Sequence, residues 1–272
     1  MLTARVALAC CIALAAGGIA VAPRAAAQGL PAPLVYLRDV DSSILQDMRY
    51  AAADNFTGRP VPGYNAPECI LLRPAAEALA RVQKDLAARK ISLKVYDCYR
   101  PQRAVRAFVA WAARRDDGGA TKRYYPRLNR SQLIPMGYIA SQSGHSRGHT
   151  IDLTLVALPE RKTPPFDAKA EYGACTGPAG ERAPDSSVDM GTGFDCFDAR
   201  SHTRTSGLTA EQAKWRDTLV DAMEKHGFQN YAREWWHFTY TRANARQSYD
   251  VPIGPRASGR PAPRSPDAQP KN

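Results

Sequence analysis

Apolar residues recur with two different periods along this chain, and each period predicts a different element. Between residues 73 and 90 the apolar side chains return every three or four positions, and Pro74 stands in the first turn, which predicts a helix. Between residues 150 and 156 they alternate, which predicts a strand with Asp152 and Thr154 on the face opposite the apolar one. The same reasoning predicts helices over 102–115 and 209–226 and strands over 92–99 and 231–241.

The order of these elements indicates the fold class and the domain organisation. Helices and strands follow one another without a regular strand–helix–strand alternation, so the expected class is α+β. Residues 35–252 have the length of one domain. Within it, residues 159–190 are rich in Pro, Gly and charge, which predicts a long loop or insertion. We expect residues 28–34 to form a linker and residues 253–272, rich in Pro and Arg, to form a disordered tail.

The first 27 residues have the pattern of an export signal. Arg5 precedes an apolar stretch over 6–21, and three alanines at 25–27 offer a small-residue cleavage site. The apolar stretch contains two glycines and is shorter than the roughly 20 residues that a membrane-spanning helix needs. Cleavage is therefore favoured over a membrane anchor. We expect a periplasmic or secreted protein that does not span the membrane.

The charge balance of the chain is basic, with 37 Lys and Arg against 26 Asp and Glu and a formal net charge of +11. Such a surplus favours an anionic neighbour, such as nucleic acid, a membrane surface or a wall polymer. The basic residues form no stripe interleaved with aromatics, so nucleic acid is not expected as a partner. Nothing in the pattern specifies an oligomeric state.

Cysteine usage agrees with export. Four cysteines follow the expected cleavage site, and in an oxidising compartment they allow two disulfides with three possible connectivities. Buried reduced thiols are the alternative. A zinc site built from cysteines is not expected, because no pair has the Cys-x-x-Cys spacing. The four residues are Cys69, Cys98, Cys175 and Cys196.

Two clusters carry candidate chemistry in a chain with five histidines. In the first, a glycine-containing loop carries His145 and leads into the strand that carries Asp152, so the two side chains can converge on one ion. The second is Glu234-Trp235-Trp236-His237, in which a bend or bulge is needed to bring Glu234 and His237 to one site. Two imidazoles and one carboxylate leave a fourth position open, which is the composition of a catalytic zinc site. Glu234, outside the ligand set, could then accept a proton from water.

Each cluster also has an ordinary structural interpretation. A histidine near a strand is more often packed or hydrogen-bonded than a metal ligand. Glu-Trp-Trp-His is also compatible with an interfacial aromatic belt or a core strand with a paired carboxylate. The two clusters together, in an exported chain with few histidines, favour zinc.

The sequence around these clusters resembles a known family, the zinc D-Ala-D-Ala metallopeptidases, and within it the dipeptidases of the VanX type. The shared runs are Ser-x-His-x-x-Gly-x-x-Ile-Asp and Glu-Trp-Trp-His. Further similar segments follow in the same order from about Val35 to Pro252, among them Met48-Arg49-Tyr50-Ala51, Asp97-Cys98-Tyr99-Arg100-Pro101 and Met190-Gly191-Thr192-Gly193-Phe194-Asp195. The resemblance implies a Hedgehog/DD-peptidase-like fold with a central, mainly antiparallel sheet flanked by helices. It also implies zinc-dependent hydrolysis of D-alanyl-D-alanine, with a small dipeptide as the substrate and one Zn²⁺ per chain.

The resemblance further implies a role for each matching residue. His145, Asp152 and His237 match the zinc ligands, and Glu234 matches the catalytic base. Arg100 matches the arginine that stabilises the developing oxyanion. Residues expected near the bound dipeptide are Tyr50, Asp97, Ser143 and Asp195, the last of which is suited to pair with the ammonium group of the substrate.

Some features depart from the family pattern. Cys98 stands where a small residue is usual, and we expect it to form a disulfide with Cys69. A second expected bridge, Cys175–Cys196, would tie the 159–190 segment beside the substrate site. Two other functions remain open. One is a D,D- or L,D-carboxypeptidase that trims peptidoglycan stem peptides with the same zinc chemistry, and the other is a non-catalytic zinc-binding wall or interaction domain.

Overall fold

A five-stranded sheet organises residues 30–256, the part of the chain that this computed structural model describes. Its strands lie in the order β2 (Leu45–Gln46), β4 (Ile91–Asp97), β5 (Thr150–Ala157), β7 (His237–Tyr240) and β6 (Phe228–Asn230). Strands β2 and β4 run parallel, and the other three neighbouring pairs run antiparallel. A separate antiparallel pair consists of β1 (Leu34–Tyr36) and β3 (Ile70–Leu72). The expected α+β class with a mainly antiparallel sheet is confirmed.

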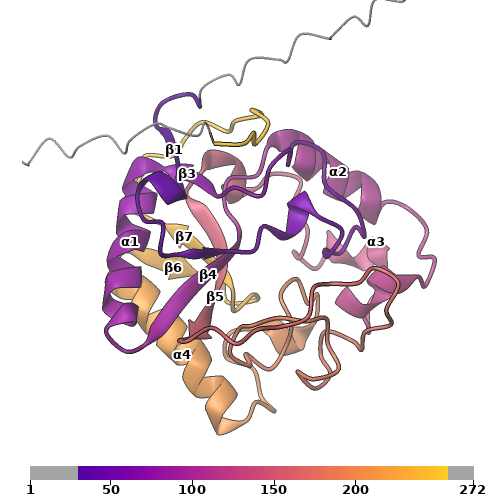
Figure 1. Ribbon diagram of the computed structural model, residues 1–272. Helices are drawn as coiled ribbons and strands as arrows, with labels where there is room; N and C mark the ends of the chain where they lie inside the picture. Colours follow the sequence, from indigo (N-terminus) through magenta and orange to yellow (C-terminus); the bar gives the residue numbers. More distant parts are fainter. Residues whose placement is uncertain (1–29, 257–272) are drawn as a thin grey trace, which may run out of the picture.

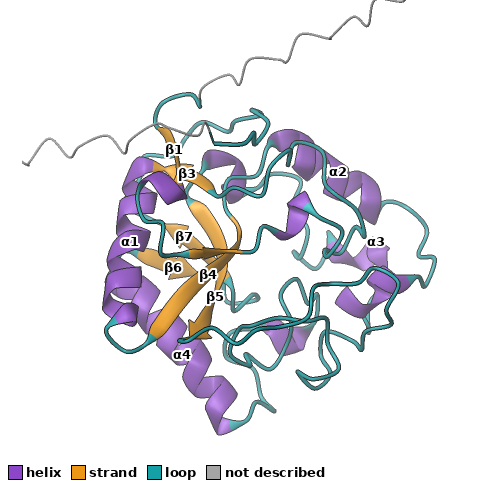
Figure 2. Cartoon of the chain, viewed as in Figure 1, coloured by secondary structure: helices purple, strands orange, loops and turns teal. Residues whose placement is uncertain are grey.

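Helices cover both faces of the sheet (Figure 1). On one face, α1 (Arg73–Ala87) packs against β4, and α4 (Ala210–Lys225) packs against β5, β6 and α1. Figure 2 shows α2 (Gln102–Ala112), the short α3 (Arg130–Leu133) and long loops on the other side. Five 3₁₀ turns complete the regular structure, namely η1 (Leu37–Asp39), η2 (Arg49–Ala51), η3 (Ala120–Tyr124), η4 (Gly144–Arg147) and η5 (Ala199–Ser201).

The signals that begin and end the two long helices are local. Thr209 and Gln212 form a capping box at the start of α4, and Gly227, with φ of +90°, follows its end. A side chain at Gly227 would also meet Arg242, because a Cβ there would lie 2.7 Å from its Nε atom. At the other long helix, Pro74 occupies the first turn of α1. Both helices begin and end within a few residues of the predicted bounds.

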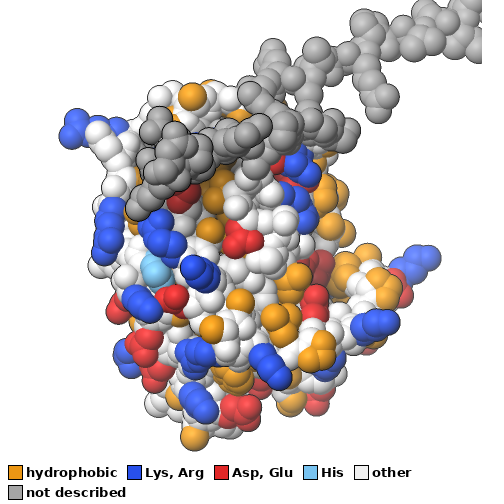
Figure 3. All heavy atoms as spheres, turned by 60° about the vertical axis from the view of Figure 1, so that its left-hand side comes forward, with side chains coloured by type: hydrophobic (Ala, Val, Ile, Leu, Met, Phe, Trp, Pro, Cys, Tyr) orange, Lys and Arg blue, Asp and Glu red, His pale blue; other side chains and the backbone are white. Residues whose placement is uncertain are grey.

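Helices α1 and α4 are also joined at the surface. Asp85 in α1 accepts hydrogen bonds from Lys225 Nζ at 2.6 Å and from His226 Nε2 at 2.8 Å. Figure 3 turns this side of the molecule forward and shows basic and acidic side chains interspersed on it. Exposed ion pairs of this kind contribute roughly 0–1 kcal/mol each, so the buried apolar faces of the helices carry most of the packing energy.

Strand β5 crosses the centre of the molecule, and residues 150–156 are all buried. Leu153 and Leu155 share a face with Val95 and Leu93, their partners in β4, and this apolar face is covered by α1 and α4. Asp152 lies on the opposite face, as the alternation predicted. The sheet therefore presents its polar positions to the side with α2 and the long loops.

Two features differ from the sequence-based expectation. The strand predicted over 231–241 is wrong in its first half, since β7 begins at His237 and a turn occupies 231–236, where Glu234 N donates to Tyr231 O at 2.9 Å. Trp235 and Trp236 are buried by packing around the turn, whereas Tyr231 is exposed. The short strands β1, β2, β3 and β6 were not predicted. In contrast, residues 159–190 contain no helix or strand, as expected.

The ends of the folded region extend slightly beyond the expected boundaries. Leu34, in the expected linker, pairs with Leu72, and Ile253 is fully buried and bridges Tyr64. The expected export signal over 1–27 and the tail from residue 257 onward lie outside the described residues. Among residues 30–256, no helix has the length and apolar character needed to cross a bilayer.

Candidate active site

Three side chains with metal-binding atoms come from three elements and meet at one point. Asp152 lies in β5, and the antiparallel register places His237, the first residue of β7, directly opposite it. His145 lies in η4, the turn that leads into β5. The Nδ1 atom of His237 is 3.0 Å from Asp152 Oδ1, and His145 Nε2 is 3.4 Å from each of these two atoms. The loop-then-strand arrangement therefore brings His145 and Asp152 together.

These three donor atoms fit a single divalent cation. Tetrahedral Zn²⁺ with bonds of about 2.0–2.1 Å holds its ligand atoms about 3.3–3.4 Å apart, close to the observed spacings. Oδ1 of Asp152 is buried and has no hydrogen-bond partner among the described residues, which leaves its lone pairs available to a cation. The cluster can therefore bind a metal ion through three protein ligands and leave a fourth position open.

Contacts around the ligands fix their protonation. His145 Nδ1 is 2.7 Å from the carbonyl oxygen of Cys98, and because a carbonyl only accepts, Nδ1 carries the proton and Nε2 is free to bind a metal. Burial raises the pKa of Asp152, but the neighbouring imidazoles of His145 and His237 outweigh burial and hold this pKa well below its usual range. Asp152 is thus a carboxylate.

A β-bulge in β4 brings a second aspartate to the same face of the sheet. Val95 pairs with Leu153, but Asp97 pairs with Asp152, so Tyr96 is the extra residue. In a regular strand, Asp97 would share the face of Val95, two residues earlier, and would point toward the helices. The bulge instead places the fully buried Asp97 beside the metal-binding cluster.

Arg100 lies between Asp97 and Asp152. Its Nε donates to Asp97 Oδ2 at 2.9 Å, and its Nη2 is 3.5 Å from Asp152 Oδ2. The guanidinium also packs over two aromatic rings, 5.3 Å from the centroid of Tyr50 and 5.0 Å from that of Phe108. These contacts hold a permanent positive charge at the edge of the metal-binding cluster.

Glu234 lies beside this cluster but outside the ligand set. A turn closed by the hydrogen bond from His237 N to Glu234 O, at 3.2 Å, supplies the predicted bend. It places Glu234 Oε2 3.4 Å from His237 Nδ1. Burial raises the pKa of Glu234 well above its usual value, and the charge of Asp152 raises it further. A carboxylate with a raised pKa is suited to accept a proton and return it.

Asp195 is a buried carboxylate that forms no ion pair with any of the described residues. Tyr50 donates its hydroxyl to Asp195, with Oδ2 at 2.8 Å and Oδ1 at 3.1 Å. Burial raises the pKa of Asp195 well above its usual value. Its backbone φ of +56° lies in the left-handed region, which non-glycine residues rarely adopt unless the surrounding structure holds them there.

These groups border one cavity of about 220 Å³. This volume is below the roughly 300–1,000 Å³ of sites for drug-sized ligands, which favours a small ligand. Eight of the nine predicted site residues line the cavity, including Ser143, whose Oγ accepts from His145 N at 3.3 Å. The ninth, Asp97, lies behind Arg100. Sequence reasoning missed most of the aromatic wall, which consists of Phe56, Phe108, Tyr138, Phe197, Tyr231 and Trp236.

Both expected disulfides are present. The Cα atoms of Cys69 and Cys98 are 5.3 Å apart, and those of Cys175 and Cys196 are 5.4 Å apart. The first bridge fixes the residue whose carbonyl orients His145. The second ties the 159–190 segment to the residue that follows Asp195. Two disulfides indicate an oxidising compartment outside the cytoplasm.

Comparison with known proteins gives consistent matches. The family model Peptidase M15, described as D-Ala-D-Ala dipeptidase, matches residues 31–162 and 183–253. A D-alanyl-D-alanine dipeptidase of Enterococcus faecalis is 39% identical over 204 residues, which are 75% of this chain and 89% of the relative. Dipeptidases of the same name from Enterococcus faecium and Streptomyces coelicolor are 35% and 36% identical, and each comparison covers 80% of this chain and 96% of the relative.

Proposed function

This chain belongs to the peptidase M15 family, and from this premise we propose that it is a zinc-dependent D-alanyl-D-alanine dipeptidase of the periplasm or the cell exterior. The observation that carries the proposal is the metal-binding cluster itself. Asp152 Oδ1 is buried without a hydrogen-bond partner among the described residues, between two imidazoles and beside the free carboxylate of Glu234. Three ligands and an adjacent base are the components of metal-assisted hydrolysis.

In this proposal His145, Asp152 and His237 hold the zinc ion. A bound Zn²⁺ supplies Lewis acidity, which lowers the pKa of water toward about 7 and polarises a carbonyl oxygen. Glu234 accepts the proton of the attacking water and then passes it to the leaving amine. Arg100 donates hydrogen bonds to the oxygen that becomes negative as the peptide bond is attacked.

Recognition of a dipeptide requires groups for both of its charged ends. We assign Asp195 to the free ammonium group, because it is buried, borders the cavity and forms no ion pair among residues 30–256. Tyr50 orients this carboxylate through its hydroxyl. Ser143 borders the same cavity and is suited to hydrogen-bond the substrate backbone. A substrate with a blocked amine would leave Asp195 buried and unpaired, which costs free energy.

The test is release of D-alanine from D-Ala-D-Ala by the purified mature chain. We expect turnover that a chelator abolishes and that one equivalent of Zn²⁺ restores. A carboxypeptidase would prefer N-acetyl-D-Ala-D-Ala over the free dipeptide, because its natural substrate has no free amine at that position. Tight binding of the dipeptide without turnover would instead favour a non-catalytic domain and refute the proposal.

A further inference from the structure

A segment that the family model does not match packs directly against the stretch of chain that carries Asp195. The model matches residues 31–162 and 183–253, so residues 163–182 are additional to it. They form no helix or strand, and two of their side chains attach them to the chain that follows. Cys175 is bonded to Cys196, and Arg182 pairs with Asp189.

Cys175 contacts the chain on both sides of Asp195. Its carbonyl oxygen accepts from Gly193 N at 2.9 Å, two residues before Asp195, and its sulfur is bonded to Cys196, the residue immediately after. Its own N–H donates to Arg123 O at 2.8 Å, which ties it to the body of the protein. One residue thus fixes the two ends of the four-residue stretch 193–196, in which Asp195 adopts its left-handed conformation.

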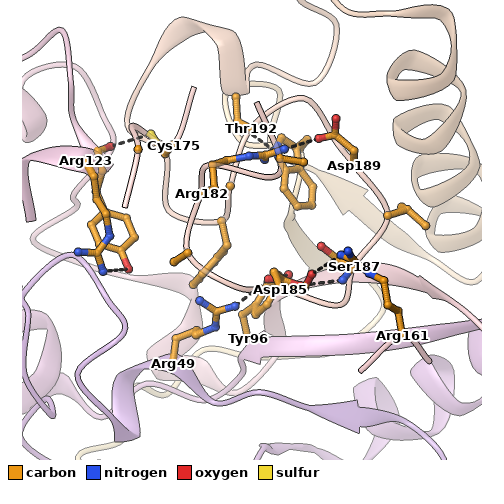
Figure 4. A pocket seen from close by; sticks show the side chains of 18 residues that line it. Arg49, Tyr96, Arg123, Arg161, Cys175, Arg182, Asp185, Ser187, Asp189 and Thr192 are labelled. Carbon is orange, nitrogen blue, oxygen red and sulfur yellow. Dashed lines mark hydrogen bonds and ion pairs between the residues drawn. The ribbon is translucent and has the colours of Figure 1, made fainter. Parts of the chain in front are cut away.

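The chain that follows the additional segment is packed against the sheet. A second cavity, of about 80 Å³, lies beside these residues. In Figure 4, Arg182 points toward Asp189 and Thr192, and Arg49 and Tyr96 lie beside Asp185. Nearer the active site, the Phe194 ring stacks on Tyr96 with centroids 4.5 Å apart. The backbone of residues 189–196 is therefore held between the additional segment and the sheet.

Taken with the proposed function, on which this inference rests, these contacts assign a positioning role. We propose that Cys175, through its bridge to Cys196 and its hydrogen bond from Gly193, holds the Asp195 carboxylate toward the cavity and thereby sets the preference for substrates with a free amino group. Cys175 itself does not border the active-site cavity, so it acts through Asp195. Misplacement of a binding group by about 1 Å can cost up to ~10²-fold in catalysis.

The test compares the wild-type protein with the double variant Cys175→Ala/Cys196→Ala. We expect KM for D-Ala-D-Ala to rise about tenfold with kcat within about threefold, and the preference for the free over the N-acetylated dipeptide to fall about tenfold. A purely structural role would reduce the amount of active protein and leave both KM and the preference unchanged, since neither depends on the folded fraction. An unchanged KM would overturn the proposal.

Two controls separate positioning from general destabilisation. Leu79→Ala removes a buried side chain from α1, on the opposite face of the sheet, and should lower the unfolding temperature without changing KM. In an Asp195→Asn background, loss of the bridge should add no further change in KM, because the two changes act through one group. An additional increase there would contradict the proposal.

Hydrolysis by the wild-type protein is measured first, because it separates failure of the proposed function from failure of the positioning role. If it hydrolyses neither dipeptide, the proposed function fails; if it is active and the bridge-less variant keeps its KM, only the positioning role fails. Should the double variant yield no folded protein, Cys175→Ser/Cys196→Ser removes the same bridge with a smaller change in side-chain volume. A KM for D-Ala-D-Ala that rises supports the role, and one that stays constant refutes it.

Discussion

Replacing Asp195 by asparagine tests how the cavity recognises its substrate. The substitution keeps the size of the side chain, and the amide oxygen can still accept from Tyr50, which donates to Asp195 at 2.8 Å. What is lost is the negative charge that we propose to lie opposite the ammonium group of the dipeptide. The carboxylate is 4% exposed and forms no ion pair with any of the described residues, so a bound ammonium group would be its direct cationic partner.

The size of the effect follows from this burial. Removing one partner of a buried, hydrogen-bonded charge pair costs about 2–5 kcal/mol. Because the asparagine can retain one hydrogen bond to the ammonium group, we take about 3 kcal/mol, which corresponds to a ~150-fold loss in kcat/KM. Burial raises the pKa of Asp195, so burial opposes its charged form, and the neutral variant should be at least as resistant to heat as the wild type.

The assay is D-alanine release from free and from N-acetylated D-Ala-D-Ala, with kcat and KM measured for each. Only hydrolysis of the free dipeptide should decline, because the acetylated one has no ammonium group. Asp217→Asn is the matched control, since it removes the same charge from an exposed pair with Arg204 on the surface of α4. A loss below threefold, or an equal loss with both substrates, would refute the assignment of Asp195 to the ammonium group.

Three further predictions concern the catalytic base, the metal and the first disulfide. Glu234→Gln should lower kcat by about 10²–10⁴-fold while zinc content stays at one per chain, and activity retained with zinc bound would exclude Glu234 as the base. Zinc at ~100 times its Kd should add about 2.7 kcal/mol to the free energy of unfolding. Denaturant titration with and without chelator measures this gain in stability, and His145→Ala should abolish most of it. Cys69→Ala/Cys98→Ala removes a bridge that closes a loop with a sequence separation of 29 residues. Its loss should lower the free energy of unfolding by about 3.6 kcal/mol. A loss below about 1 kcal/mol in the same titration would show that the bridge contributes little.

The sequence predicts the long elements of the fold because each has enough residues to display a period. Helix α4 has both its capping box and its terminal glycine in the sequence, and β5 alternates from Thr150 to Leu155. Strands β1, β2, β3 and β6 have only two or three residues each, too few for any period to appear. The aromatic run over 231–236 suggests a strand, yet the chain turns there and buries Trp235 and Trp236, so tertiary packing overrides the local pattern.

For the candidate site, the metal-binding residues could be predicted from the sequence, but the bulge and the aromatic wall could not. His145, Asp152 and His237 were identifiable because histidines are few and because their neighbours resemble family motifs. The bulge at Tyr96 that turns Asp97 toward the site leaves no mark in the sequence, since the alternation of β4 alone places Asp97 on the helix side. The same holds for the distant aromatic residues of the wall, which only the folded chain brings together.

Each disulfide adjoins an aspartate of the site. Cys98 follows Asp97 and Cys196 follows Asp195, and burial is the main cause of the raised pKa in both aspartates. Burying a carboxylate costs free energy, which a chain that can relax would recover by moving the group toward water. A covalent link next to each aspartate restricts that movement. In an oxidising compartment this chain can therefore keep two buried carboxylates preorganised at the site, with the cost offset by the stability of the whole fold.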